Sequence, residues 1–490
     1  MRRKTLKFID GQSGKKGIDF NLILDFVKTP KFLVGSVLVL LMLILGGLYL
    51  WYSHNYLNKQ QIVTNSGALS GGVEYEWQQE AADSGLVADY LWSRTRELML
   101  TGTNDETLIV SSYTLPGTLL SQEAAESGEY LLEDQALLLR CYLKDQNRAE
   151  AIELVNRVNE LIDTDYALSS GSEFGSESSE VRDASLIYGQ MCWLDAYLDY
   201  YSMYGSQSDY SRITTLVEML FDEGGMLLPG ALQVQTYDEN VMVGASDDSL
   251  GDAQSQAAQG STAQDFVAVP LEAVDLALIQ TLEVNGFLPQ GSFEKSLAIV
   301  QGARISDSLP LYAYAYYISD SGETIYLYAG RAALQSSDSA LIDIESSVKT
   351  MRNLAEVDAL PSDAYSWLKS QFMNSGRLYT TYHLIRGEMG EVELFEGYLL
   401  LMEIAVLEDD IDLYTRTVSA LAGHVATRTS SPALSMIFRT VEEVVPADSS
   451  NLAVDNSDSA TASDAASGVE TNYRNICYAY DNLMAYLLIE

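Results

Sequence analysis

The chain has 490 residues, of which 47% are hydrophobic, and it carries a formal net charge of −40 at pH 7. This length and apolar content are sufficient for a large folded core. The excess of acidic residues excludes nucleic-acid binding, because contacts to phosphate need clustered lysine and arginine. Solubility at a cell surface is the simplest explanation of so much negative charge.

Residues 32–52 form one uncharged apolar segment that ends in Trp51 and Tyr52. The segment is long enough to cross a bilayer as a helix, and its terminal aromatic side chains are typical of a membrane interface. Residues 1–31 carry eight Lys or Arg and three Asp, a net charge of +5 (8 − 3). A cleaved signal peptide is the alternative, but its apolar core is normally shorter.

Because positive charge stays on the cytoplasmic side of a membrane, the sequence predicts a single-pass protein of the cell membrane. Residues 1–31 are the expected cytoplasmic tail, 32–52 the transmembrane helix, and 53–75 a polar, glycine-containing linker. Residues 76–490 are then an extracytoplasmic domain. The N-terminus is predicted to lie in the cytoplasm and the large domain outside it.

Cysteine and histidine usage gives no indication of a metal or a disulfide framework. Cys141, Cys192 and Cys477 are an odd number for an extracytoplasmic domain, so buried free thiols are expected. There are three histidines and no C-x-x-C motif, which makes a zinc site improbable. The sequence predicts no cofactor.

Helical patterns dominate the chain after residue 76. Stretches rich in Ser, Gly, Asp and Ala interrupt them at 169–180, 245–264, 335–340 and 447–469, and we expect these to be loops. A repeated unit is visible between the loops: an apolar run preceded by an acidic residue, a polar turn, and an amphipathic run with apolar residues three or four apart.

The repeated unit predicts pairs of inner and outer helices. The pairs of clearest pattern are 134–143 with 148–162, 184–198 with 210–222, 309–335 with its inner helix at 309–318 and a turn at 319–322, and 392–425. Weaker copies are expected at 76–100, 270–300 and 363–386, a last helix at 471–490, and one strand at 231–236.

Six such hairpins fit an all-α fold, an (α/α)6 toroid of inner and outer helices. An open solenoid is the alternative, but its repeats would recur at a constant period near 34 residues. Glu133, Asp183 and Asp307, which precede three apolar runs, are irregularly spaced. Parallel inner helices would bring these three carboxylates to one rim, as acid–base hydrolysis of a glycosidic bond requires.

Four segments resemble motifs of glycoside hydrolase family 8, the endoglucanase and chitosanase family of the six-hairpin glycosidase superfamily, which includes the periplasmic cellulases of cellulose-synthesis operons. They occur in the family's order over about residues 80–430. The segments are Leu132-Glu133-Asp134-Gln135, Arg182-Asp183-Ala184-Ser185-Leu186, Gly225-Met-Leu-Leu-Pro-Gly230 and Asp307-Ser-Leu-Pro-Leu-Tyr-Ala-Tyr314.

The resemblance implies that Glu133 is the general acid, Asp307 the general base, and Asp183 the residue that holds the central sugar. The expected reaction is hydrolysis of a β-linked polysaccharide with inversion. Because the family includes cellulose-operon members, we also expect a link to exopolysaccharide synthesis or export and to the synthase machinery. The expected partners are a polysaccharide or oligosaccharide and, through one helix, the membrane. Expected substrate-binding residues are Gln135, Tyr188, Trp193, Tyr312 and Tyr314.

Each of the three acidic residues also has a structural explanation, because Asp and Glu are favoured at helix N-termini. The sequence departs from the family motifs at Asp134, Ser185 and Pro310. A catalytically impaired, glycan-binding relative of the same fold therefore remains an alternative to the enzyme. A helical scaffold that binds a protein partner is a third hypothesis.

Overall fold

The computed structural model covers the chain, and the residues that it describes fall into twelve segments. These are 30–53, 59–64, 69, 73–100, 107–115, 125–126, 129–163, 184–236, 262–328, 341–383, 389–445 and 470–490. The four loops predicted from low-complexity sequence lie wholly or mostly outside the described residues, as does most of the predicted linker at 53–75.

Helix α2, Pro30–Tyr52, belongs to a unit separate from the rest of the described chain. Its described side chains begin at Val37 and are exposed as far as Tyr52. Within the described residues, no helix combines the length and the hydrophobicity that crossing a membrane demands.

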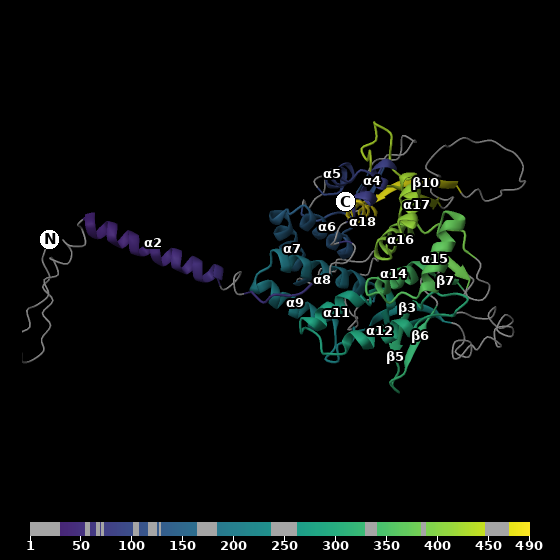
Figure 1. The fold of residues 1–490 in the computed structure, drawn as a ribbon, viewed down its shortest axis with the longest axis horizontal. Coiled ribbons are helices and arrows are strands. Elements are labelled where there is room, and N and C mark those ends of the chain that lie inside the picture. The colour runs from purple at the N-terminus through teal and green to yellow at the C-terminus, as the bar shows by residue number, and fades with distance from the viewer. Residues whose placement is uncertain are drawn as a thin grey trace, which may run out of the picture. The chain divides into compact units, whose positions relative to one another are not determined.

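An inner ring of helices forms the centre of the second unit (Figure 1). Helix α6 packs against α8, α14 against α16, α16 against α18, and α18 against α6, while the 3-10 helix η2 directly before α11 fills the gap between α8 and α14. The ring therefore closes on itself. Its members are α6 (Leu132–Lys144), α8 (Ser185–Met203), η2 (Leu271–Ala273) with α11 (Leu276–Val284), α14 (Ile344–Ala355), α16 (Glu396–Leu407) and α18 (Ala479–Ile489).

Outer helices cover this ring and are amphipathic. Helix α7, for example, buries Ala151, Leu154, Val155 and Val158 on one face and carries exposed polar residues on the other, the pattern of a surface helix. The outer helices are α4 (Tyr75–Asp83), α5 (Ala88–Met99), α7 (Arg148–Asp163), α9 (Gln207–Leu220), α12 (Ser292–Gly302), α15 (Ser362–Ser375) and α17 (Ile411–Ala422). The predicted pairing of buried and amphipathic helices is seen in α6 with α7, α8 with α9, α11 with α12, and α16 with α17.

Local sequence explains why α6 is helical and where it begins and ends. It is rich in leucine, has no β-branched residue, carries Glu133 and Asp134 in its first turn and Lys144 in its last. These charges suit the two ends of the helix dipole. The helix stops before Gln146, whose φ of 54° is left-handed and cannot continue it.

Three small antiparallel sheets accompany the helices, so the domain is helix-rich but not purely helical. Their strand orders are β2-β1-β10-β9, β3-β4-β5-β6 and β7-β8. The strands are β1 (Ser112–Thr114), β2 (Ala125–Glu126), β3 (Gly230–Thr236), β4 (Thr262–Pro270), β5 (Ala315–Ile318), β6 (Thr324–Leu327), β7 (Leu341–Asp343), β8 (Thr381–His383), β9 (Arg439–Val445) and β10 (Glu470–Tyr478). Strand β3 confirms the strand predicted at 231–236.

Strands lead directly into three of the inner helices. β4 runs into η2 and α11, β7 into α14, and β10 into α18. Side chains cap two of these starts: Asp275 accepts a hydrogen bond from the Leu278 amide at 2.9 Å, and Asp343 accepts one from the Glu345 amide at 3.0 Å. The sheets therefore lie at the N-terminal ends of these helices.

The helix predicted at 309–318 is wrong. Residues 315–318 form strand β5, which pairs with β6 in the register Ala315 to Leu327 through Ile318 to Thr324. The alternation Tyr-Ala-Tyr-Ala-Tyr from Tyr312 to Tyr316 has the period of a strand, and tyrosine and isoleucine favour strands. The polar turn predicted at 319–322 is present, but it connects strands β5 and β6 instead of two helices.

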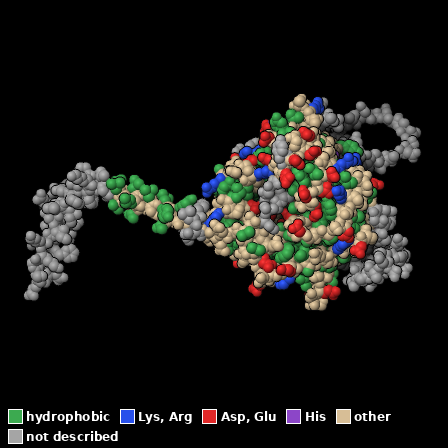
Figure 2. All heavy atoms as spheres, in the orientation of Figure 1, with side chains coloured by type: hydrophobic (Ala, Val, Ile, Leu, Met, Phe, Trp, Pro, Cys, Tyr) green, Lys and Arg blue, Asp and Glu red, His purple; other side chains and the backbone are tan. Residues whose placement is uncertain are grey.

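Acidic side chains are spread over the face drawn in Figure 2, and basic ones are fewer. This agrees with the net charge of −40. The three cysteines are free; Cys141 and Cys477 are buried and Cys192 is partly buried. The prediction of free thiols is confirmed.

Candidate active site

A cleft opens where the N-terminal ends of the inner helices meet. It consists of two pockets that share Glu133, Tyr188 and Tyr480. The first, here called the rim pocket, has an empty volume of about 590 Å³ and is lined from the first turns of α6, α14, α16 and α18. The second, the axial pocket, has an empty volume of about 410 Å³ and is lined by residues of α6, α8, α14 and α18 and by Asp275, which precedes α11.

Glu133 is the second residue of α6 and lies in the wall of both pockets. Burial raises the pKa of its carboxyl above the ordinary value, and the negative charges of Glu272 and Glu396 act in the same direction. Its own backbone amide and the ammonium group of Lys349 oppose this rise without cancelling it. The cleft therefore favours the protonated form of Glu133.

Helix α8 approaches the Glu133 side chain through a glycine. A Cβ atom at Gly189 would lie 2.8 Å from Oε2 of Glu133 and 3.3 Å from Cβ of Leu132. Any side chain at this position would displace the carboxyl group. The missing side chain at Gly189 gives the Glu133 carboxyl its place in the cleft wall.

Two more glutamates and two cations line the rim pocket opposite and beside Glu133. Lys349 of α14 donates to Oε1 of Glu345 at 2.5 Å and lies 3.7 Å from Oε2 of Glu272. Arg439, the first residue of β9, lies 2.9 Å from Oε1 of Glu396. The Lys349 ammonium is also 4.6 Å from the centre of the Tyr188 ring, within cation–π range.

Glu396 is the ionised carboxylate of the rim pocket. Burial by itself raises its pKa, but Arg439, Lys349 and a hydrogen bond from Glu345 together lower the pKa to about 2. Glu345 behaves in the opposite way: burial and the neighbouring charge of Glu396 raise its pKa to about 8 although Lys349 opposes this. One pocket thus contains carboxyl groups in both protonation states near neutral pH.

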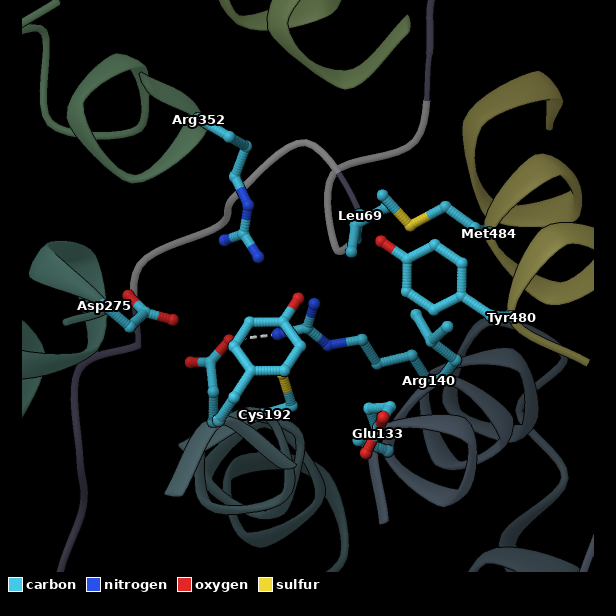
Figure 3. A pocket seen from close by; sticks show the side chains of 12 residues that line it. Leu69, Glu133, Arg140, Cys192, Asp275, Arg352, Tyr480 and Met484 are labelled. Carbon is cyan, nitrogen blue, oxygen red and sulfur yellow. Dashed lines mark hydrogen bonds and ion pairs between the residues drawn. The ribbon is translucent and has the colours of Figure 1, made fainter. Parts of the chain in front are cut away.

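Charged side chains also line the axial pocket. Figure 3 shows the side chains of Arg140, Arg352 and Asp275 pointing into it. Arg140 forms an ion pair with Asp195 on α8, and Arg352 is 2.9 Å from Oε2 of Glu356. Burial and the charges of Glu356 and Asp195 raise the pKa of Asp275 to about 7. The axis of the ring is therefore polar, although each inner helix is buried.

Asp134 follows Glu133 and lies deeper in the wall, with 1% of its surface exposed. Ser111 is a hydrogen-bond partner of this carboxyl, although the Ser111 hydroxyl also donates to the carbonyl of Glu129 at 3.0 Å. Burial raises the pKa of Asp134 well above the ordinary value, and the charge of Glu133 adds to this. A protonated Asp134 is the form that this site tolerates best.

The other predicted catalytic residues are not in the described lining of these two pockets. Asp183 lies outside the described residues, directly before Ala184 at the start of α8. Asp307 lies on an exposed turn, its carboxyl fully open to solvent and 3.8 Å from the guanidinium of Arg304. Because residues 309–318 are not an inner helix, Asp307 is not carried to the rim, and the structure gives no support to its predicted role as base.

Of the predicted substrate-binding residues, only Tyr188 lines the cleft. The Gln135 amide is fully buried and binds both the amide and the carbonyl of Ile109, at 3.0 and 2.9 Å. Trp193 lines a small apolar pocket between α6, α8 and α9, while Tyr312 and Tyr314 are buried in the core. These four side chains serve packing in the described structure.

Sequence reasoning missed the charged residues of α14, which were not assigned to any helix. Glu345, Lys349, Arg352 and Glu356 recur at intervals of four, three and four residues, so they form one stripe on a helix. In the sequence, such a stripe is typical of the solvent-exposed face of a helix. The spacing and the N-cap residue Asp343 could therefore have predicted helix α14, but not that it belongs to the inner ring.

Comparisons with known proteins do not assign a family. No family model matches the chain, and no curated protein matches it. Similar solved structures include glycoside hydrolases. One is an α-amylase from Clostridium perfringens, with 17% identity, a TM-score of 0.49, and coverage of 81% of this chain and 98% of that one.

Two further solved structures have lower scores. A β-1,3-1,4-glucanase from Paenibacillus sp. X4 has 11% identity and a TM-score of 0.42, with coverage of 88% and 95%. A GH8 xylobiose complex from Teredinibacter turnerae has 10% identity and a TM-score of 0.37, with coverage of 73% and 97%. At these scores the likeness identifies neither activity nor substrate for this chain.

Proposed function

We propose that this protein is a glycoside hydrolase that cleaves a β-linked polysaccharide with inversion. One observation carries the proposal: a carboxyl group whose surroundings favour the protonated form, that of Glu133, lines the same open pocket as the ionised carboxylate of Glu396. Inverting hydrolysis needs an acid that protonates the leaving oxygen and a carboxylate that activates water on the opposite face of the sugar. Tyr188 and Tyr480 supply aromatic surface in the lining of the same pocket.

The first test is activity of the full chain in detergent on a panel of β-1,4-linked polysaccharides, measured as release of reducing ends. Glu133→Gln should lower turnover by about 10²–10⁴, the usual effect of removing a positioned proton donor. The variant keeps the size of the side chain, so oligosaccharide binding and thermal unfolding should change little. Nuclear magnetic resonance of the first product formed will show its anomeric configuration, and retention would contradict the inverting mechanism.

A catalytically impaired, glycan-binding protein is the second candidate. The observation in its favour is that Lys349 and Arg439 pair with the carboxylates of the rim pocket while Asp307 lies outside its lining. In that case the wild-type chain would bind oligosaccharides in calorimetry but release no reducing ends from any polymer of the panel.

We further propose that the chain is held in the cell membrane by residues 32–52, with its N-terminus in the cytoplasm. The support is the uncharged apolar segment and the net charge of +5 that precedes it. Protease added outside intact cells should digest the large domain and leave residues 1–31 protected. Protection of the large domain would contradict the proposal. Co-purification with a polysaccharide synthase would test the proposed link to exopolysaccharide export.

A further inference from the structure

Glu345 and Glu396 form a pair of carboxyl groups in the wall of the rim pocket. Glu345 is the second residue of α14 and Glu396 the first residue of α16, and these two inner helices are neighbours. Both carboxyl groups line the rim pocket, and a hydrogen bond between them raises the pKa of Glu345 and lowers that of Glu396. A hydrogen bond between two carboxyl groups requires one proton between them, so the pair carries one proton and one negative charge.

Each member of the pair has its own cation. The Lys349 ammonium contacts Glu345 at 2.5 Å, and the Arg439 guanidinium contacts Glu396 at 2.9 Å. Arg439 is itself held by two further contacts to Asp481, at 2.6 and 2.7 Å. The single negative charge of the pair is therefore stabilised inside a half-buried pocket, while the side chains remain partly exposed to the cleft.

The order of helices in the ring places Glu345 across the cleft from Glu133, and Glu396 on the next helix of the ring. The sequence around the ring is α6, α8, α11, α14, α16 and α18, so α14 stands opposite α6. A sugar bound between them would turn its leaving oxygen toward Glu133 and the other face of its ring toward Glu345 and Glu396. Inversion requires acid and base on these two sides.

We propose that the Glu345–Glu396 pair is the general base, an inference that rests on the proposed glycosidase function. Water attacks the anomeric carbon while the bond from that carbon to the leaving oxygen breaks. The leaving oxygen takes the proton of Glu133, and the pair takes one proton from the attacking water. The pair then returns its extra proton to solvent, and Glu133 regains one from solvent. The net reaction consumes one water and yields two sugar hydroxyls.

Other charged and titratable groups act on the pair from the surrounding elements. Besides Lys349 and Arg439, these are Glu133 and Asp134 of α6, Glu272 of η2, Tyr188 of α8, and Tyr480 and Asp481 of α18. Glu272 also contacts Lys349, at 3.7 Å. Glu294 of α12 is exposed and lines neither pocket, so it serves as the control for loss of one negative charge.

The experiment compares Glu345→Gln, Glu396→Gln, the double variant and Glu294→Gln in the full chain. Each single variant of the pair should lower kcat by about 10²–10⁴. The double variant should fall within about tenfold of the worse single one, because groups that act as a unit are not additive. Glu294→Gln should keep kcat close to that of wild type. Oligosaccharide binding and thermal unfolding confirm that each variant is folded.

A change of leaving group separates base from acid. On a dinitrophenyl glycoside of the sugar that wild type hydrolyses, the departing phenolate needs no proton. Glu133→Gln should therefore recover most of its lost rate, whereas the two variants of the pair should stay slow because water still needs a base. Where Glu345→Gln or Glu396→Gln fails to fold, Glu345→Asp or Glu396→Asp replaces it, and the shortened acid should also lower kcat.

The outcomes distinguish the two proposals. If the wild-type protein has no hydrolytic activity, both the proposed glycosidase function and the assignment of the Glu345–Glu396 pair as general base are overturned. Active wild type, a slow Glu133→Gln variant and fully active variants of the pair would overturn the base alone. Recovery of the pair variants on the dinitrophenyl glycoside would do the same, because it would assign them to protonation of the leaving group.

Discussion

Acidic and basic neighbours act in opposite directions on the pKa of the Glu133 carboxyl. Burial and the charge of Glu396 favour its proton, and Lys349 opposes them. The same lysine also contacts Glu345 at 2.5 Å. A single ammonium group thus acts on carboxyl groups from two opposite helices of the ring, so substitutions at Lys349 affect several residues of the cleft together.

Gly189 provides a test of how closely α8 must approach Glu133. Gly189→Ala places a methyl group 2.8 Å from Oε2 of Glu133 in the present arrangement, so the carboxyl must move and kcat should fall by at least tenfold. Alanine favours a helix over glycine by about 1 kcal/mol, which offsets part of the 1–3 kcal/mol typical of overpacking. The free energy of unfolding in urea should therefore change by less than about 2 kcal/mol. Wild-type kcat in this variant would contradict the argument.

Sequence predicted the Glu133 end of the cleft but not the opposite wall. Glu133 and Tyr188 stand in or beside apolar runs whose motifs are recognisable, and both line the cleft. Glu345 and Glu396 could not be identified, because their roles depend on which helices become neighbours in the ring. Asp307 was selected from a motif whose local alternation of residues forms a strand instead of a helix.

Arg439 of strand β9 links the inner helices α16 and α18. Arg439 contacts Glu396 at the start of α16 and Asp481 near the start of α18. Asp481 is fully buried. An arginine that pairs a buried and a half-buried carboxylate holds the helix ends in register, and its removal leaves the buried charge of Asp481 without compensation.

Arg439→Met should lower the free energy of unfolding by about 3–5 kcal/mol, as measured in urea at pH 7. The double variant Arg439→Met with Asp481→Asn should recover part of that loss, because it removes the uncompensated buried charge. An equal loss in the single and double variants would show that packing of the arginine, and not charge, is responsible. Arg416 on the exposed side of α17 is a control position, where Arg416→Met should cost less than about 0.5 kcal/mol.

Helix patterns were predictable wherever apolar residues recur at helical spacing, as in α7, α9 and α17. The closed ring followed from counting hairpins. The strands next to the inner helices were mostly missed, since short strands such as β7 hold too few residues for an alternating pattern. The charged residues along the axis of the ring could not be predicted, because charged side chains at helical spacing ordinarily indicate a solvent-exposed helix face.

At the scale of the whole molecule, the ring encloses several carboxyl groups that hold their protons more tightly than the unfolded chain does. The pKa of Asp275 is raised to about 7 and that of Glu345 to about 8, while that of Asp134 is raised well above the ordinary value. Between the unfolded and the folded pKa values, the folded state binds more protons. Stability from these groups is complete below about pH 4 and is lost as the pH rises.

The free energy of unfolding should therefore fall between about pH 4 and pH 8, in addition to any effect of the net charge of −40. Asp134→Asn should reduce this slope and stabilise the protein at pH 8, because an amide cannot ionise at a buried site that disfavours a charged carboxylate. Urea denaturation at several pH values measures both effects. A variant as steeply dependent on pH as wild type would contradict the role of Asp134.

The contact of α18 with α5 and α6 has a consequence for synthesis of the chain. α6 leaves the ribosome early, whereas α18 follows only after roughly 330 further residues, which takes about 15–70 s at ordinary translation rates. Until then, the apolar sides of α5 and α6 lack the helix that covers them. We expect nascent chains to depend on chaperones during this interval, and a premature stop before residue 479 to yield an aggregating product.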